Sequence, residues 1–233
     1  ANVGIGNTTP NSELHVVGDI RAIGNIIAEN YIVSSSVTYM TSSFASGSTV
    51  FGNSNDDTHT FTGSLFITGS RIDLHDGKKN VSVGQNAGAA VTTASGSIFL
   101  GYSAGNGVTT GNRNIAIGRG AMNTGGTTGD NNIAIGASAG DALTSGFSNI
   151  LLGEDAGGKI NSGDHNFFAG EDVGLNITTG DGNIAIGYHA FDDTNSGPAA
   201  SNNIFLGYAA GSGVWGGSAS EIIGLGSFTL YGS

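Results

Sequence analysis

The chain has no cysteine and only 2 prolines among its 233 residues, and charged residues make up 11% of it. Without cysteine, a disulfide scaffold and thiolate metal sites are excluded. The charged fraction is less than half of the roughly 25% that is usual in globular proteins. No apolar run approaches the roughly 18 residues that a membrane-spanning helix needs, so we expect no membrane insertion.

Positive charge is especially scarce. There are 7 Lys and Arg residues against 18 Asp and Glu residues, which gives a net charge of −11. Clustered Lys and Arg side chains are the footprint of nucleic-acid binding. The last basic residue is Lys159, and no basic cluster precedes it. The sequence therefore predicts no nucleic-acid partner.

Glycine, by contrast, is abundant at 42 residues, and a glycine repeatedly ends a short apolar segment in the second half of the chain. Successive motif glycines are 17, 17, 18, 17, 17, 17, 20 and 17 residues apart. They are Gly84, Gly101, Gly118, Gly136, Gly153, Gly170, Gly187, Gly207 and Gly224. One unit this short cannot bury its own apolar face, so the period predicts a solenoid of stacked coils of about 17 residues.

The repeat reads Asn-Ile-x-Ile-Gly-x-x-Ala-Gly, as in residues 114–122 with one change and residues 132–140. Ile and Val in so short a run favour a β-strand, in which alternate residues share one face. We interpret the two flanking apolar residues of each copy as pointing together into the coil. The predicted core ladder is Ile115, Ile117, Ile133, Ile135, Ile150, Leu152, Ile184, Ile186, Ile204 and Leu206.

On this interpretation the central residue of each strand lies outside the coil, yet it too is apolar in most copies. A continuous apolar stripe needs a cover. Another copy of the chain around a symmetry axis is the natural one, and a monomeric roll is the alternative. The predicted interface between copies is Phe99, Ala116, Ala134, Leu151, Phe168, Ala185 and Phe205.

Two further repeat positions have a structural interpretation. A small residue three positions after each motif glycine, such as Ala121, predicts a sharp inward corner. Asn recurs four positions before the glycine, and stacked Asn side chains can hydrogen-bond along a solenoid. These residues are Asn80, Asn114, Asn132, Asn149, Asn166, Asn183 and Asn203.

Residues 1–79 do not keep the period. Their short apolar segments are punctuated by Gly, Asn, Ser and Thr, and they offer no compact core. Such strands commonly interleave with copies of themselves, so we expect an intertwined fibre shaft. The predicted domains are this shaft at 1–79, a β-roll solenoid of about nine repeats at 80–226, and a C-terminal strand or cap at 227–233.

Adjacent acids recur one repeat apart, as Glu154 with Asp155 and Glu171 with Asp172. Stacked coils would bring these like charges about 5 Å apart, which is costly without screening. Solvated turns are the favoured interpretation. Calcium bound through the carboxylates is the alternative.

Loops on rigid scaffolds commonly carry binding residues. The longest spacer lies between Gly187 and Gly207, and it contributes Tyr188, His189 and Phe191 as candidate receptor contacts. Trp215, the one tryptophan, is a further candidate, with a plug for the last coil as the favoured interpretation.

No pattern indicates an enzyme or a cofactor. The histidines lack metal-type spacing. The paired acids are adjacent in turns, where their side chains diverge, whereas glycoside hydrolysis needs two carboxylates at a set separation. The G-x-G-x-x-G pattern at residues 211–216 has no helix after it, which a dinucleotide site requires.

The segment NVGIGNTTP at residues 2–10, followed by LHV at 14–16, resembles tail-fibre proteins of tailed bacteriophages, as do residues 48–65. The Asn-Ile-Ala-Ile-Gly repeats resemble the head repeats of trimeric autotransporter adhesins. This resemblance implies an all-β homotrimer, in which an intertwined trimeric β-shaft is followed by a left-handed parallel β-roll solenoid. The coils here are longer than is usual in adhesin heads.

The resemblance further implies a phage tail or capsid fibre for host-surface attachment, located in the virion. Its partners would be other virion fibre or baseplate proteins and a host-surface glycan or outer-membrane protein. A bacterial trimeric surface adhesin or extracellular filament subunit is the alternative, with an extracellular or cell-surface location. A polysaccharide-degrading tailspike comes third.

Overall fold

The computed structural model describes residues 2–9, 11–17, 23, 78–192, 200–213 and 220–230. The chain divides into two compact units, Ala1–Phe66 and Ile67–Ser233. Strands are the only regular elements in the described residues, so the fold is all-β. Within these ranges there is no helix of the length and apolarity needed to cross a membrane.

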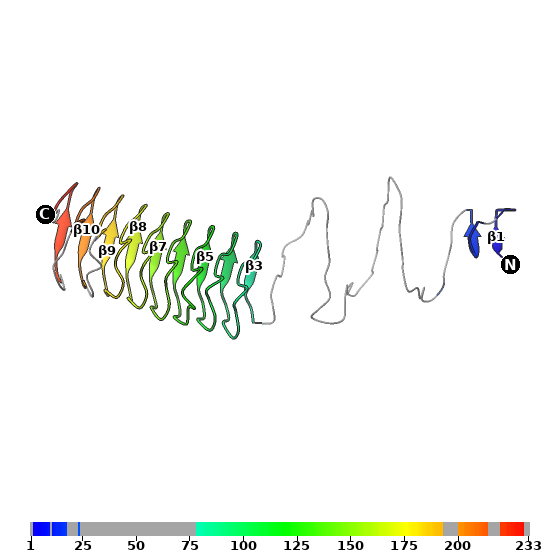
Figure 1. Ribbon diagram of the computed structural model, residues 1–233, viewed down its shortest axis with the longest axis horizontal. Helices are drawn as coiled ribbons and strands as arrows, with labels where there is room; N and C mark the ends of the chain where they lie inside the picture. Colours follow the sequence, from blue (N-terminus) through cyan, green and yellow to red (C-terminus); the bar gives the residue numbers. More distant parts are fainter. Residues whose placement is uncertain are drawn as a thin grey trace. The chain divides into compact units, whose positions relative to one another are not determined.

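The second unit contains nine three-residue strands in one parallel sheet, in which each strand pairs with the next along the chain. Figure 1 shows these strands side by side along the length of the stack, each joined to the next by a single coil. They are β3 (Val81–Val83), β4 (Ile98–Leu100), β5 (Ile115–Ile117), β6 (Ile133–Ile135), β7 (Ile150–Leu152), β8 (Phe167–Ala169), β9 (Ile184–Ile186), β10 (Ile204–Leu206) and β11 (Ile223–Leu225). The predicted parallel β-solenoid of coils of about 17 residues is confirmed.

Strand register corrects the end of the repeat. Phe205 of β10 pairs with Gly224 of β11, so Gly224 occupies the central strand position. Gly226, with φ +108°, therefore follows β11 as the motif glycine. The hydrogen bond from Ile222 N to Asn203 Oδ1 likewise joins residues 19 apart. The last coil is thus longer than the 17-residue step inferred from Gly224.

The motif glycines are required by both conformation and space. From Gly84 to Gly207 their φ angles lie between +124° and +143°, a region that residues with side chains rarely adopt. A Cβ on Gly153 would also approach the Gly170 carbonyl oxygen to 2.2 Å. Because that obstacle is the backbone of the next coil, no side chain can move to relieve it.

The solenoid core lies on the opposite side of the strands from the side predicted. The central residues have no exposed surface: Phe99, Ala116, Ala134, Leu151, Phe168, Ala185 and Phe205. They form the core and not an interface between copies, so that prediction was wrong. The predicted core ladder is likewise on the outer face, half-buried or exposed: Ile115, Ile117, Ile133, Ile135, Ile150, Leu152, Ile184, Ile186, Ile204 and Leu206.

The physical reason is that the coil has room for only one side chain from each strand. Phe99 fills its coil so fully that a Cβ on Gly105 would approach its Cδ1 atom to 2.0 Å. Where the central residue is the small Ala185, the buried Phe191 takes up the space in the same coil. Its ring lies 4.8 Å from that of Phe205 in the next coil. In these coils the interior is therefore filled by exchanging volume between the two positions.

Two other expectations for the repeat are confirmed. The small residues after the motif glycines are buried, with Ala121 and Ala139 both fully inaccessible. The Asn residues of the ladder are also buried, at 0–3% exposure. Residues such as Leu143 and Ile160, seven positions after the motif glycine, complete the core.

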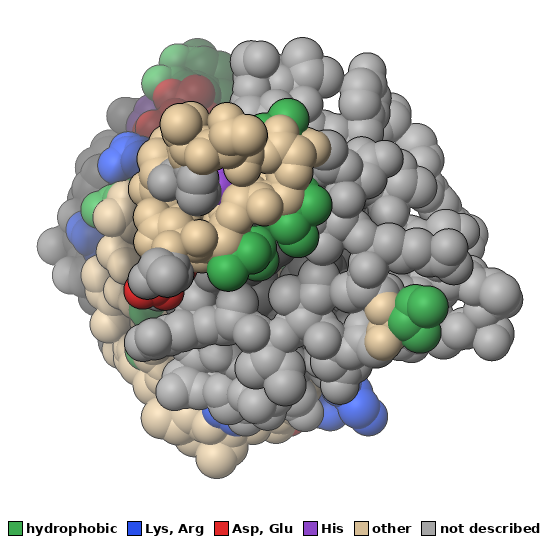
Figure 2. Space-filling model, turned by 90° about the vertical axis from the view of Figure 1, so that its right-hand side faces the viewer, with side chains coloured by type: hydrophobic (Ala, Val, Ile, Leu, Met, Phe, Trp, Pro, Cys, Tyr) green, Lys and Arg blue, Asp and Glu red, His purple; other side chains and the backbone are tan. Residues whose placement is uncertain are grey.

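In the described part of the first unit, two strands, β1 (Val3–Ile5) and β2 (Leu14–Val16), pair in parallel with Val3 opposite Leu14. Val3, Ile5 and Leu14 are more than half exposed, as is Val17 just after β2, whereas Val16 is half-buried. Figure 2 shows hydrophobic side chains open on the surface. Two strands this short cannot form a stable sheet alone. The trimeric shaft predicted for residues 1–79 stays a prediction, and most of it lies outside the described residues.

Candidate functional site

The outer face of the nine-stranded sheet is the strongest candidate for a functional surface. It consists of the first and third residues of β3 to β11, and we call it the sheet face. Its first-position column is Val81, Ile98, Ile115, Ile133, Ile150, Phe167, Ile184, Ile204 and Ile223. Its third-position column is Val83, Leu100, Ile117, Ile135, Leu152, Ala169, Ile186, Leu206 and Leu225. Every residue is apolar, and none is charged.

The sheet face is accessible along the whole stack. Ile98 and Ile186 are 36% and 41% exposed, and Leu225 at the C-terminal end is 60% exposed. Nine strands about 4.8 Å apart and three residues wide make a strip of roughly 38 Å by 10 Å. Apolar patches of several hundred Å² mark interaction sites on soluble proteins. The sheet face is therefore a candidate interaction surface.

Exposed aromatic rings lie at the corner next to the sheet face in the last coils. The rings of Tyr188 and Tyr208 stack with centroids 5.4 Å apart and planes 20° apart. Phe228 meets Tyr208 edge-on at 5.1 Å. Each of these residues comes one or two positions after a motif glycine, so the repeat brings them together although they are about 20 residues apart in sequence. They extend the apolar surface beyond the strands.

Two of the four predicted receptor contacts are accessible. Tyr188 is 40% exposed. The His189 ring lies between two carboxylates, with Nδ1 3.1 Å from Asp192 Oδ2 and Nε2 3.5 Å from Asp172 Oδ2. These contacts fix the imidazole at the corner, and they account for His189 as a structural residue that remains partly accessible.

The other two predicted contacts are not supported. Phe191 is fully buried and packs in the core, so it cannot contact a receptor. The prediction for Phe191 failed because this coil has Ala185 at its central position, which leaves room inside for the ring. Trp215 lies outside the described residues.

The stacked acids do not assemble into a metal centre. Within the described part of the chain, no three His, Asp or Glu side chains form a group that could hold a metal ion. This includes Glu154, Asp155, Glu171 and Asp172. Burial, followed by the charges of Asp172, Glu154 and Asp141, raises the pKa of Asp155. The like charges that the sequence predicts to stack therefore contribute to the raised pKa of the Asp155 carboxyl group.

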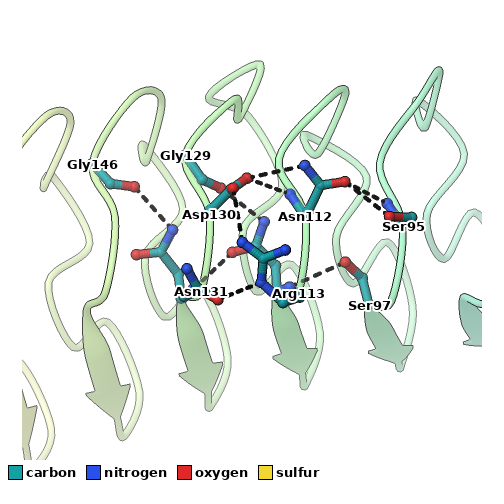
Figure 3. A network of polar contacts seen from close by, with 10 residues as sticks. Ser95, Ser97, Asn112, Arg113, Gly129, Asp130, Asn131 and Gly146 are labelled. Carbon is teal, nitrogen blue, oxygen red and sulfur yellow. Dashed lines mark hydrogen bonds and ion pairs between the residues drawn. The ribbon is translucent and has the colours of Figure 1, made fainter.

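The buried Asn side chains form a continuous ladder. Asn114 Oδ1 accepts a hydrogen bond from the backbone N–H of Asn132 at 2.8 Å, and Asn132 Oδ1 accepts one from the N–H of Asn149 at 3.0 Å. The Asn132 amide also donates to the Gly146 carbonyl at 2.9 Å (Figure 3). Each Asn thus joins its own coil to the next, which assigns the ladder a structural role.

A second, outer ladder was not foreseen. Asn112 Oδ1 accepts from the Ser95 N–H at 3.0 Å, and Asp130 Oδ1 accepts from the Asn112 N–H at 2.7 Å. Arg113 donates to Asp130 at 3.2 Å and to Asn131 at 2.7 Å (Figure 3). The signal was the recurrence of Ser, Asn or Asp two positions before the ladder Asn. These polar groups are already engaged within the chain.

Comparison with protein-family models, with curated proteins and with solved structures gives no match to this chain. The polar ladders of the solenoid are occupied with joining its coils, whereas its sheet face has no cover within the described residues. The sheet face is therefore the candidate interaction surface of the solenoid.

Proposed function

We propose that this chain is a structural fibre protein whose copies associate into a homotrimer through the sheet face. The observation that carries the proposal is the uncharged apolar strip along all nine strands. The interface is the flanking strand residues and not the central residues predicted from the sequence. The number of copies rests on the resemblance of the repeats to trimeric adhesin heads.

The size of the sheet face agrees with stable association. Its projected area of roughly 400 Å² corresponds to about 10 kcal/mol of gross hydrophobic stabilisation per chain. Three chains together gain about 30 kcal/mol, against two association steps that each cost about 4–15 kcal/mol. The gross hydrophobic gain therefore equals the upper estimate of the association cost and exceeds the lower one, before any contribution from the shaft.

Within this proposal the fibre is a phage tail or capsid fibre that attaches the virion to its host. The support is the resemblance of residues 2–16 and 48–65 to phage tail fibres, together with a repeat architecture suited to reach. Its partners are other virion fibre or baseplate proteins and a host-surface glycan or outer-membrane protein. Three copies of each contact on one particle strengthen attachment through multivalency.

The test is the native mass of the intact chain and of two lysine variants. Ile117→Lys places a charge in the middle of the sheet face, whereas Thr110→Lys adds the same charge at an exposed position outside the sheet. We expect trimers for the wild type and Thr110→Lys, and dissociation to monomers for Ile117→Lys. A wild-type monomer that persists at all concentrations would refute the assembly. Co-purification with virions then distinguishes a phage fibre from a cell-envelope adhesin.

A further inference from the structure

Strand β8 differs from every other strand of the sheet face. It has Phe167 in the first position and Ala169 in the third, where the other strands have Val, Ile or Leu. One side chain is thus unusually large and its neighbour on the same face is unusually small. Within one chain, Ala169 lies between Leu152 and Ile186 of the paired strands and leaves a notch in that column.

The packing inside the coil does not explain this exchange of size. The interior of the β8 coil is filled by Phe168 together with Val173 and Ile177, and Phe168 is fully buried on the side away from the sheet face. A Cβ on Gly174 would approach its ring to 2.4 Å, so no spare volume remains there. Phe167 and Ala169 are both partly exposed on the outer side. Their sizes matter only to whatever covers that side.

A cyclic assembly brings these two residues together. When the symmetry axis runs parallel to the stack, equivalent strands of all copies lie at the same height. Rotation about that axis places the first-position column of one copy against the third-position column of the next. Phe167 of each copy therefore faces Ala169 of its neighbour. This holds for any cyclic number of copies whose sheet faces point towards the axis.

We infer that Phe167 and Ala169 form a knob and a notch that fix the axial register between copies of this chain. The inference rests on the proposed assembly through the sheet face. The remaining strands have similar side chains at a constant spacing, so a slip by one coil would exchange Ile or Leu for Ile or Leu. A slip at β8 instead presses Phe167 against Leu152 or Ile186 of the neighbour and leaves a void at Ala169.

The first experiment exchanges the two residues in the full chain. Ala169→Phe sets Phe against Phe, and Phe167→Ala sets Ala against Ala. The double variant Phe167→Ala/Ala169→Phe restores one knob and one notch at the same height. We expect the dissociation constant, measured by sedimentation, to rise at least tenfold in each single variant and to return within about threefold of wild type in the double variant.

The second experiment measures register directly. Because the chain has no cysteine, engineered pairs report contacts between copies. Ile133→Cys with Ile135→Cys should cross-link neighbouring copies at one height in the wild-type background. Ile133→Cys with Leu152→Cys requires a slip by one coil. It should cross-link only when Phe167→Ile and Ala169→Leu have made the sheet face uniform.

The outcomes separate the two proposals. A monomeric wild type overturns the assembly and the register device with it. An assembled wild type whose exchange variant is as weak as Ala169→Phe overturns the register device alone. Equal one-coil cross-linking in the wild-type and uniform backgrounds has the same consequence. Recovery in the exchange variant also shows that Ala169→Phe does not act by unfolding the chain.

Discussion

Asn166 provides the sharpest test of how the solenoid is held together. Its side chain is fully buried in the middle of the ladder. Oδ1 accepts from the backbone N–H of Asn183 at 3.0 Å and from its side-chain amide at 2.9 Å. Nδ2 donates to the Gly180 carbonyl at 2.8 Å and to Asn149 Oδ1 at 3.0 Å. One side chain thus connects three successive coils.

The cost of its removal follows from the groups that lose a partner. In Asn166→Ala, the Asn183 N–H loses its acceptor and the Gly180 carbonyl loses its amide donor. At about 2 kcal/mol for each buried group, the free energy of unfolding should fall by about 4 kcal/mol. Asn166→Ser should cost about half as much, because a hydroxyl keeps the acceptor. Ser97 already does this in the ladder, where its Oγ accepts from the Asn114 N–H at 3.0 Å.

Urea unfolding followed by circular dichroism, at one fixed protein concentration, measures the free energy of unfolding of the wild type, Asn166→Ala and Asn166→Ser. Hydrogen exchange at the Asn183 amide locates the effect. Asn86→Gly is the control, since Asn86 is exposed and has φ +59°, which glycine adopts freely. We expect it to change stability by less than about 0.5 kcal/mol. The reasoning is refuted if Asn166→Ala costs less than about 1 kcal/mol, or if the Ser and Ala variants are equally unstable.

Two further predictions concern backbone strain and charge. Gly153→Ala should lower stability by more than about 2 kcal/mol because of its φ of +131° and the Gly170 carbonyl 2.2 Å from the new Cβ. Gly126→Ala, at φ +65° with open space around it, should cost only about 1 kcal/mol, and equal melting temperatures for the two would contradict this account. Asp155→Asn should stabilise the protein at pH 7 by a few tenths of a kcal/mol, since the charge of Asp155 is opposed by burial and by Asp172. Because folding raises the pKa of Asp155, the folded state binds this proton more tightly than the unfolded state. The advantage of Asn should therefore disappear as the pH falls through the raised pKa towards 3.8, and a difference in melting temperature that does not vary with pH would argue against it.

The period of the motif glycines was sufficient to predict the solenoid and its coil length. The reason is a requirement of each coil for glycine: each motif glycine adopts a φ that other residues avoid, and it lies against the backbone of the next coil. A sequence that stacks in this way must repeat glycine at every coil. The ladder Asn was predictable for a similar reason, because a buried amide needs partners above and below. Both features are set by contacts between equivalent positions.

The last coil shows where this reasoning ends. Gly224 and Gly226 both follow the expected pattern of apolar residues, and only strand pairing shows that Gly226 is the motif glycine. The spacing of Gly224 from the preceding motif glycine predicted neither its strand register nor its role in the coil. Only its neighbour in space, Phe205, makes the distinction: a Cβ on Gly224 would approach the Phe205 ring to 2.8 Å.

The prediction of which strand face is buried was wrong, because alternation shows which residues share a face but not which face lies inside the coil. In a strand such as Ile-Ala-Ile both faces are apolar, and the larger residues were assigned to the core. One signal in the sequence is compensation of volume, although the coil with Ala134 and Gly140 does not show it. Phe99 and Phe205 are each followed six residues later by glycine, whereas Ala116 and Ala185 are followed there by Met122 and Phe191.

A large side chain compensates for a small one only where the two fill the same closed space. The compensation in these coils therefore identifies the central strand position as part of the interior. The same logic applies to the sheet face. Phe167 and Ala169 exchange volume with no shared space inside one chain, because both lie on the outer face while Phe168, Val173 and Ile177 occupy the interior of that coil. In the assembly that we propose, two chains form the closed space that these residues fill. Volume compensation then separates the core of the coil from the proposed surface between copies, which hydrophobicity alone does not.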